Sequence, residues 1–377
     1  MSGHAASDRA WAANAIAQLH REAARSADTH LLHMRFDGFP GIDFYFKDEA
    51  AHPTGSLKHR LARSLFLYAL CNGRLRPGQS VVDASSGSTA ISEAWFARLL
   101  GLPFVAVMPA CTAPGKIRDV QSLGARCDLV DDPAQVHARA AWHAERGACH
   151  LDQFGLAERA TDWRGNNNIA ESIFGQLALE EHPVPSWIVV GAGTGGTSAT
   201  IGRYLRYHRH NTQLAVVDPE NSAFYPGWLE SRGAAAGGPR SDTADPAAQD
   251  QGTAVGQPSR IEGIGRARLE PSFVPAVIDH MIPVPDGASV AAMRHLHEHA
   301  GLQAGPSTGT NLWGVWQLIA EMVAEGCRGS VVSLICDGAD RYAGNYYNPD
   351  WLRSQGLDPA PYEETLRQFF ASGTWPS

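Results

Sequence analysis

The chain has 377 residues, of which 44% are hydrophobic, and it carries a formal net charge of -8 at pH 7 with a pI near 6.0. A chain of this length and composition can bury a large core, and we expect two domains. The acidic balance argues against nonspecific nucleic-acid binding, and no apolar run reaches the roughly 18 to 20 residues that a membrane-spanning helix needs. We therefore expect neither nucleic acid nor a membrane as a partner.

The cysteines and histidines give no sign of a metal site. Six cysteines are scattered without a CxxC pair, which indicates neither a zinc site nor a set of disulfides. Reduced thiols suit the cytoplasm, where we expect the protein to act. His295, His297 and His299 lie on one expected helix, but only His295 and His299 share a face, which favours a solvated surface over metal binding.

The N-terminal region leads to one lysine. Residues 8–26 have the apolar spacing of an amphipathic helix whose expected buried side is Trp11, Ile16 and Leu19. Residues 31–36 and 42–47 read as two short strands. Residues 53–56 are turn and N-cap types, and apolar spacing predicts a helix over residues 57–70. Lys58 therefore lies just inside a helix start.

Lys58 is the first candidate for catalysis. The positive end of the helix macrodipole and the neighbouring Arg60 both disfavour its ammonium form. A neutral lysine amine can form a Schiff base with a carbonyl group. A solvated surface lysine is the alternative interpretation of the same residue.

From residue 80 the chain alternates between strands and helices, which predicts parallel sheets covered by helices. The expected strands are 80–83, 104–108, 126–130, 187–190, 214–218 and 330–335. The expected helices are 89–100, 114–123, 133–146, 169–179, 198–208 and 289–300. An expected loop at 304–310 leads into another helix that ends at 325, and residues 350–377 read as a docked helical tail. Residues 232–258 are rich in small and polar residues and predict a mobile surface insertion.

The strand at 187–190 leads into a glycine-rich loop that has several interpretations. Gly191, Gly193 and Gly196 match GxGxxG, and Asp218 ends the next strand, which is the pattern of a dinucleotide site. The same loop can bind a bare phosphate, because glycines let backbone N–H groups approach an anion at a helix N-terminus. A tight turn without any ligand is the third interpretation. A phosphate site together with a Schiff-base lysine is what pyridoxal phosphate requires.

Together these motifs resemble the pyridoxal-phosphate enzymes of the tryptophan synthase β-like fold (fold type II), specifically the cysteine synthase and cystathionine β-synthase family. The resemblance covers residues 41–347. It implies two open twisted parallel-sheet α/β domains with pyridoxal 5'-phosphate in the cleft between them, and a homodimer. Residues 1–51 and 159–377 would form the larger, phosphate-binding domain, and residues 52–158 the smaller mobile domain that carries the substrate-carboxylate loop.

The resemblance also implies the site residues. The segment 53–60 matches the lysine motif of the family, so Lys58 would bind the cofactor covalently. The phosphate contacts would be Gly193, Thr194, Gly195, Gly196 and Thr197, and Ser307 would contact the pyridine nitrogen. The contacts to the substrate carboxylate would be Ser85, Ser86, Gly87, Thr89 and Gln153, with Gly263 in the closing loop at the mouth of the site.

Two positions depart from the family pattern. Ser88 stands where the family has an asparagine beside the ring oxygen of the cofactor. The segment 336–342 replaces the usual Pro-Ser-Ser-Gly-Glu-Arg-Tyr and puts Asp337 close to the expected ring, next to Cys336. Cys336 at a strand end is more typical of a small buried side chain than of a nucleophile. These departures look like the branch of bacterial L-cysteine desulfhydrases.

The resemblance therefore implies α,β-elimination of L-cysteine to hydrogen sulfide, pyruvate and ammonia through an aminoacrylate, with Lys58 as the base that removes the Cα proton. A hydroxyl at the pyridine nitrogen, unlike a carboxylate, would favour elimination over transamination. Cysteine synthase (O-acetylserine sulfhydrylase), which adds sulfide to the same aminoacrylate, is the alternative. A nicotinamide-dependent oxidoreductase and a catalytically silent sensor on the same fold are more remote.

Overall fold

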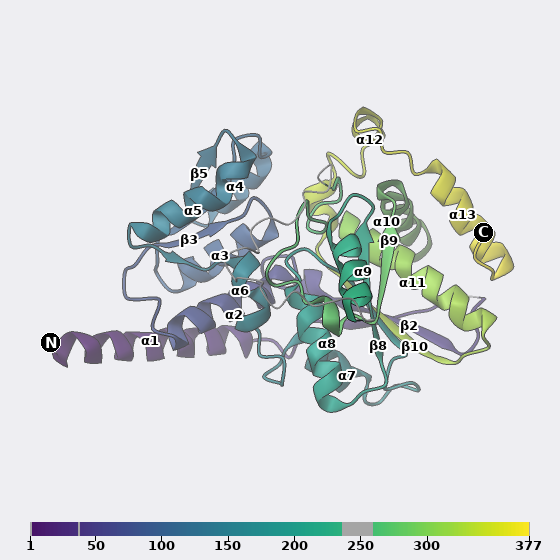
Figure 1. The fold of residues 1–377 in the computed structure, drawn as a ribbon, viewed down its shortest axis with the longest axis horizontal. Helices are drawn as coiled ribbons and strands as arrows, with labels where there is room; N and C mark the ends of the chain where they lie inside the picture. The colour runs from purple at the N-terminus through teal and green to yellow at the C-terminus, as the bar shows by residue number, and fades with distance from the viewer. Residues whose placement is uncertain (1, 37, 236–258, 377) are drawn as a thin grey trace. The chain divides into compact units, whose positions relative to one another are not determined.

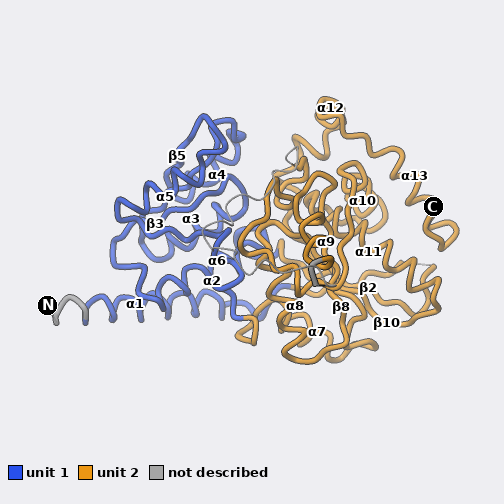
Figure 2. Tube along the Cα trace, viewed as in Figure 1, with its two compact units in different colours: residues 1–29, 51–162 blue, residues 30–50, 163–377 orange. Residues whose placement is uncertain are grey.

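The computed structural model describes residues 2–36, 38–235 and 259–376, and the chain divides into two compact units (Figure 2). Unit 1 comprises residues 1–29 and 51–162, and unit 2 comprises residues 30–50 and 163–377. Each unit has its own sheet with helices around it, and from β3 onward the described strands pair in parallel, as the alternation of strands and helices predicted.

The N-terminal helix belongs to a different unit from the one we expected. We assigned residues 1–51 to the larger domain, but residues 1–29 lie in unit 1. The reason is the apolar face of α1 (Ser2–Ala23), because Ala15 and Leu19 are buried in the hydrophobic core of unit 1. Trp11 and Ile16 pack against the same core, so the predicted buried side of this helix is confirmed.

Among the described residues, the sheet of unit 1 has four strands in the order β5-β4-β3-β6, all parallel. Their bounds are β3 (Val81–Ala84), β4 (Phe104–Pro109), β5 (Arg126–Val130) and β6 (Cys149–His150). The helices after α1 are α2 (Lys58–Cys71), α3 (Ser88–Leu99), α4 (Pro114–Ser122), η2 (Pro133–Gln135), α5 (Val136–Glu145) and α6 (Gln153–Ala160) (Figure 1). β3 is buried throughout, as expected for a strand covered on both faces.

Within the described residues, the sheet of unit 2 has six strands in the order β1-β2-β10-β7-β8-β9, and only the β1–β2 pair is antiparallel. The strands are β1 (Leu31–Met34), β2 (Ile42–Asp48), β7 (Trp187–Gly191), β8 (Gln213–Pro219), β9 (His280–Val284) and β10 (Gly329–Ile335). The helices are α7 (Ile169–Leu177), α8 (Gly196–His208), α9 (Phe224–Ala235), η4 (Pro275–Val277), α10 (Asp286–Ala300), α11 (Pro306–Ala324), η5 (Ala339–Tyr342), α12 (Pro349–Ser354) and α13 (Ala360–Ser372), with η1 (Glu49–Ala51) where the chain passes into unit 1.

The core of unit 2 forms around α11, which lies directly on the sheet. A Cβ atom at Gly314 would lie 2.4 Å from Cγ1 of Val217 on β8, so glycine allows this close approach. Trp316 on α11 is fully buried, and Leu366 and Phe369 of α13 belong to the same core. The predicted docking of the C-terminal tail is therefore confirmed.

Several elements differ from the sequence-based expectation. α9 reaches Ala235, so residues 232–235 are helical rather than part of an insertion, and the rest of the expected mobile insertion, 236–258, lies outside the described residues. The expected loop at 304–310 becomes helix from Pro306, because proline suits the first position of a helix. β9 was missed because it is a short edge strand that contains Pro283. No helix in the described parts of the chain is long and apolar enough to cross a bilayer.

Candidate active site

In unit 1 the expected substrate loop lies where the order of the sheet reverses. β4 and β5 extend the sheet on one side of β3, and β6 pairs with β3 on the other. Ligands of parallel α/β sheets bind at the carboxyl ends of the strands at such a reversal. Residues 85–89 follow β3 and Gln153 follows β6. The topology therefore brings the two expected carboxylate-binding elements together.

Hydrogen bonds join these two elements directly. The hydroxyl of Thr89 donates to Oε1 of Gln153 at 2.8 Å, and Nε2 of Gln153 donates to the carbonyl oxygen of Ala84 at 2.9 Å. Thr89 and Gln153 are both buried. Their position fits the role that we expected, and their mutual hydrogen bond fixes the orientation of the Gln153 amide.

The first turn of α3 is built to receive an anion. Gly87 stands at the N-cap and has no side chain to cap the helix, while Oγ of Ser85 accepts the backbone N–H of Ala90 at 3.2 Å. Ser85, Ser86, Gly87 and Ser88 are all half-buried. The helix dipole and the N–H groups at this end favour a carboxylate.

Lys58 is the first residue of α2 and is half-buried. The predicted turn before it is confirmed, because the N–H of Gly55 donates to the carbonyl of His52 at 2.7 Å and Gly55 has φ of 69°. The N-cap is Leu57, without a side-chain cap, so a capping role for residues 53–56 is wrong. Arg60 pairs with Asp28 at 2.6 Å, so a carboxylate offsets the positive charge that we expected to act on Lys58.

The chain contains only three lysines, Lys47, Lys58 and Lys116. Lys47 in unit 2 is fully buried, and its Nζ donates to Oε1 of Gln176 at 2.7 Å. Lys116 lies on α4. Lys58 is the lysine that begins a helix packed against α3, the helix of the expected substrate loop. The choice of Lys58 as the Schiff-base candidate thus has few competitors.

Two acidic side chains below the substrate loop were missed by sequence reasoning. Asp83 at the end of β3 is fully buried, accepts the N–H of Gln153 at 3.1 Å and lies 3.3 Å from Nε2 of His150. Glu93 on α3 is fully buried, and this burial together with the Asp83 carboxylate raises the pKa of Glu93 well above its usual range, against the smaller effect of Lys58. A glutamate within the apolar run 90–97 was the available signal.

In unit 2 the glycine loop also lies at a reversal of strand order. β8 and β9 extend the sheet on one side of β7, and β10 pairs with β7 on the other. The loop at 192–195 follows β7, and Cys336 and Asp337 follow β10. The two segments therefore lie at the carboxyl ends of neighbouring strands, where a ligand binds in such sheets.

The glycine loop fits a phosphate group. Gly195 has φ of 90°, and a Cβ atom there would lie 2.5 Å from Cα of Phe273, so only glycine fits at this position. α8 begins at Gly196 without a side-chain cap, so its N-terminus presents backbone donors. Thr194 is buried, and its hydroxyl oxygen lies 3.4 Å from the N–H of Gly196. These features suit a bound dianion at a helix start.

The expected closing loop contacts the glycine loop within unit 2. The N–H of Gly265 donates to the carbonyl of Ala192 at 3.1 Å, and Nε of Arg266 donates to the carbonyl of Gly193 at 2.8 Å. Gly263 is exposed and has φ of 91°. Arg266 brings a positive charge to the expected phosphate site, and sequence reasoning missed it because its partner lies 73 positions away in the chain.

Ser307, Cys336 and Asp337 come together at the start of α11. Ser307 is buried in the first turn of this helix, and the N–H of Gly305 donates to the carbonyl of Asp337 at 3.1 Å. The hydroxyl of Tyr342 donates to Oδ2 of Asp337 at 2.6 Å, and burial together with this carboxylate raises the pKa of Tyr342. Cys336 is buried, as its interpretation as a small core side chain predicted.

The remaining candidates of the sequence do not form a site. Asp218, which a dinucleotide site would need, is fully buried and accepts the N–H of Tyr225 at 2.9 Å, so it is not available to a ribose. His295 is buried, with its ring 3.9 Å from that of His299 and 4.4 Å from that of Phe370. The expectation of a solvated face is therefore wrong for His295.

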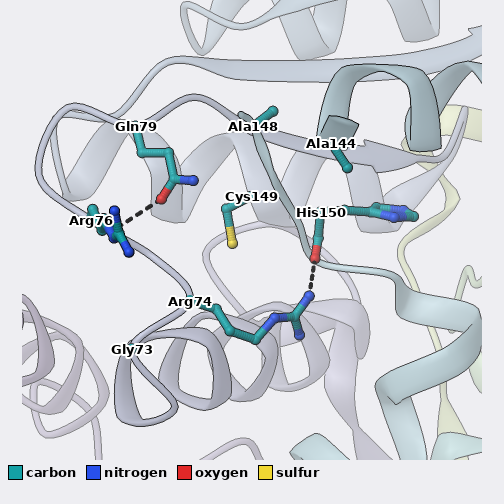
Figure 3. Close-up of a pocket in the computed structure, with 8 residues that line it drawn as sticks. All are labelled: Gly73, Arg74, Arg76, Gln79, Ala144, Ala148, Cys149 and His150. Carbon is teal, nitrogen blue, oxygen red and sulfur yellow. Dashed lines mark hydrogen bonds between the residues drawn. The ribbon is translucent and has the colours of Figure 1, made fainter. Parts of the chain in front are cut away.

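A separate cavity of about 420 Å³ lies at the amino ends of the strands of the unit 1 sheet (Figure 3). Its lining includes Gln79, just before β3, and Cys149, the first residue of β6. Arg74 reaches across it and donates to the carbonyl oxygen of His150 at 2.8 Å. Because this cavity lies at the amino ends of the strands, it is not part of the site that contains Ser85 and Gln153.

This chain is similar to known proteins over most of its length. The family model described as pyridoxal-phosphate dependent enzyme matches residues 26–337. The chain is 56% identical to L-cysteine desulfhydrase Cds1 of Mycobacterium tuberculosis over 372 residues, which cover 97% of this chain and 96% of that protein. It is 27% identical to a cysteine synthase of Dictyostelium discoideum, over 84% of this chain and 81% of that protein. The solved structure of O-ureido-L-serine synthase shares its fold, with a TM-score of 0.68 and 23% identity over 84% of this chain and 91% of that one.

Proposed function

Because the chain belongs to the family of pyridoxal-phosphate dependent enzymes, we propose that it is an L-cysteine desulfhydrase. The reaction converts L-cysteine and water into hydrogen sulfide, pyruvate and ammonia. The observation that carries this choice is the 56% identity to a desulfhydrase across 97% of the chain, against 27% to a cysteine synthase. When bound, pyridoxal phosphate supplies an electron sink for the carbanion that forms at the substrate Cα.

Unit 1 would contribute the base and the substrate-carboxylate contacts. Lys58 would bind the cofactor aldehyde and, once displaced by the substrate amine, would remove the Cα proton at its Nζ. The N–H groups and hydroxyls at the start of α3 would hold the substrate carboxylate, and Gln153 is oriented by Thr89 and Ala84. The carboxylate contacts within this proposal are Ser85, Ser86, Gly87, Thr89 and Gln153.

Unit 2 would contribute the groups that hold the cofactor. The backbone donors of Gly193–Thr197 would bind the phosphate, supported by the positive charge of Arg266 near Gly193. Ser307 would contact the pyridine nitrogen through its hydroxyl. A hydroxyl there, unlike a carboxylate, would not keep that nitrogen protonated, so the cofactor would be a weaker electron sink and loss of the β-substituent would be favoured.

Two further residues lie near the expected ring in this proposal. Ser88 is shorter than the asparagine of the family, so the contact to the ring oxygen would be made through water, supplied by another group or absent. Asp337 is held by the hydroxyl of Tyr342 and carries its carboxylate at the end of β10, next to the buried Cys336.

The test combines chemical labelling with a product assay. Purified protein reconstituted with pyridoxal phosphate and treated with borohydride is digested and analysed by mass spectrometry. The expected result is added mass at Lys58 and at neither Lys47 nor Lys116. A separate sample of the reconstituted protein, without borohydride, should release sulfide and pyruvate in equal amounts when it is incubated with L-cysteine.

The same assay separates the alternatives. Formation of cysteine from O-acetylserine and sulfide, without sulfide release from L-cysteine, would identify a synthase. Labelling of Lys58 without turnover of any β-substituted amino acid would identify a sensor. Absence of labelling at Lys58 would overturn the proposal as a whole.

The compartment and the assembly are parts of the same proposal. All six cysteines are free thiols, which supports action in a reducing cytoplasm. The homodimer follows from the family resemblance, and light scattering on the holoprotein tests it. A mass of about one chain, 40.5 kDa, would contradict the dimer.

A further inference from the structure

A chain of hydrogen bonds in unit 1 joins the N-terminal helix to the helix of the substrate loop. Oε1 of Glu22 on α1 lies 3.1 Å from Nε2 of His59. Oγ1 of Thr54 lies 3.1 Å from Nδ1 of His59 and 2.9 Å from Oγ of Ser92 on α3. The hydroxyl of Ser92 also lies 3.0 Å from the carbonyl oxygen of Ser88. This series of hydrogen bonds thus reaches Ser88, the first residue of α3.

This chain passes directly beside the catalytic lysine. His59 is the residue after Lys58, and Thr54 belongs to the turn that precedes it. His59 is 1% exposed, Thr54 5% and Ser92 0%. Solvent water is therefore poorly placed to substitute for any of these partners, so each must satisfy the next.

The protonation states of His59 and Glu22 decide which group donates in each of these hydrogen bonds. Burial lowers the pKa of His59, as do His52 and Arg63, while Glu22 raises it less, so the neutral imidazole is favoured. For Glu22, burial raises the pKa, but the hydrogen bond with His59 and the nearby positive charges lower it on balance. The Glu22 carboxylate must then accept from Nε2–H of His59.

The hydroxyl groups follow from this assignment. With its proton on Nε2, His59 can only accept at Nδ1, so the hydroxyl of Thr54 donates to it. Because the one hydroxyl proton of Thr54 is used in that bond, Thr54 can only accept from Ser92, so Ser92 donates to it. The Ser92 hydroxyl is placed to donate to the carbonyl oxygen of Ser88 at 3.0 Å, and in this state it donates to Thr54 instead.

Protonation of His59 at Nδ1 reverses each of these bonds. Nδ1–H donates to Thr54, Thr54 donates to Ser92, and Ser92 donates to the carbonyl of Ser88. The groups that face His59 and set this equilibrium are Glu22 on α1, His52 in the turn and Arg63 on α2. The charge state of a residue next to Lys58 is thus coupled to the first turn of α3.

The N-terminal segment also holds the next residue of α2. The guanidinium of Arg60 donates to Oδ1 of Asp28 at 2.6 Å and to the hydroxyl of Thr29 at 3.0 Å. The two residues that directly follow Lys58 are therefore each bonded to the segment 22–29. The start of α2 cannot shift along its axis without breaking both sets of bonds.

We propose that His59, Thr54 and Ser92, anchored by Glu22, are positioning residues that hold the Lys58 turn and the first turn of α3 in register for the reaction. The inference rests on the proposed function, because it takes Lys58 as the residue that binds the cofactor. It gives the N-terminal helix a part in the active unit that the sequence motifs do not indicate.

The first test needs no cofactor. Imidazole 15N NMR of the cofactor-free protein near neutral pH should show His59 as the neutral Nε2–H tautomer. Glu22→Gln should keep that tautomer, because its amide oxygen still accepts, whereas Glu22→Ala should lose it. His20→Gln, on the exposed side of α1, is the matched control and should leave the His59 signals unchanged. A His59 with its proton on Nδ1 in the unaltered protein would overturn the proposal.

The second test is a double-mutant cycle between the two ends of the chain. Glu22→Ala and Ser92→Ala should each raise KM for L-cysteine and shift the pH midpoint of the visible band of the lysine-bound cofactor. Their combined effect on KM should depart from additivity by about three- to tenfold, as expected for residues that share one network. Glu145→Ala, at the exposed end of α5, combined with Ser92→Ala should be additive. Additivity of Glu22→Ala with Ser92→Ala would overturn the proposal.

The outcomes distinguish this proposal from the proposed function. If borohydride does not label Lys58, the function fails while the NMR result stands by itself. If Lys58 is labelled but the cycle is additive, only the positioning role fails. Should Glu22→Ala not fold, as judged by circular dichroism, the cycle is measured between His59→Gln and Ser92→Ala with the same criterion.

Discussion

Glu93 on α3 lies against Asp83 on β3, and both side chains are fully buried in unit 1. Asp83 lies 3.3 Å from Nε2 of His150 and accepts the N–H groups of Gln153 and Ala84. Two buried carboxylates at such close range repel each other, so one of them keeps its proton. Glu93 is therefore the neutral partner.

The neutral state of Glu93 predicts the behaviour of Glu93→Gln. Because the pKa of Glu93 is raised in the folded state, the unaltered protein loses stability as pH rises from the ordinary glutamate pKa, about 4.3, through the raised value. An amide has no such loss. The unfolding free energy, measured by urea denaturation, should therefore fall from pH 5 to pH 9 by less in Glu93→Gln than in the unaltered protein.

Glu145→Gln, an exposed substitution on α5, is the control for this comparison. Its stability difference from the unaltered protein should not change over the same pH range. A Glu93→Gln difference that is equally flat would show that Glu93 is ionised in the folded state.

Replacing Lys58 tests the base. Lys58→Ala removes the amine that would abstract the Cα proton, a contribution that is typically about 10²- to 10⁴-fold in rate. Sulfide release from L-cysteine should fall by at least the lower figure, and the visible band of the lysine-bound cofactor should disappear. Lys116→Ala on α4 should leave both unchanged. Full activity of Lys58→Ala would contradict the assignment.

The glycine loop predicts a loss of cofactor when it gains a side chain. At Gly195, with φ of 90°, alanine meets the backbone of Phe273 at 2.5 Å, and the conformation alone costs about 1–3 kcal/mol. Gly195→Ala should therefore weaken pyridoxal-phosphate binding, measured by the fraction of holoprotein after dialysis. Gly175→Ala on α7, where no atom lies within 4 Å of the new Cβ, should retain the cofactor.

Asp218 predicts a pH dependence of stability in unit 2. Burial raises its pKa to about 7, against the hydrogen bonds from Ser222 and Tyr225. Its contribution to stability is fully present below the ordinary aspartate pKa, about 3.9, and is lost as pH rises through about 7. Asp218→Asn should flatten the unfolding free energy between pH 4 and 8, while the exposed Asp119→Asn should not. An unchanged profile for Asp218→Asn would mean that the carboxyl titrates at its ordinary pH.

The sequence predicted those parts of the site that depend on local pattern. Residues close together in the sequence determine the turn before Lys58, the glycine loop before α8 and the alternation of strands and helices. What it could not predict are contacts made across the fold, such as Asp28 with Arg60 or Arg266 with Gly193. Those pairs depend on which elements become neighbours, and the type of either residue gives no sign of its partner.

The assignment of the N-terminal helix failed for the same reason. Its amphipathic pattern gave the buried face, including Leu19, but nothing in that pattern names the surface that covers it. Similarly, the run 306–310 has the composition of a loop, and only the start of α11 at Pro306 shows that Ser307 lies on a helix.

The pairing of β2 with β10 sets the order in which the two units can fold during synthesis. Ile42 pairs with Gly329, so β2 cannot complete its pairing until β10 has been synthesised. Meanwhile residues 51–162 can close into their own sheet, since β3 to β6 are already complete. A nascent chain arrested before residue 329 would thus hold a finished unit 1, while β2 and β7 would each expose the edge that β10 covers. Such open edges are templates for aggregation that a chaperone would have to cover.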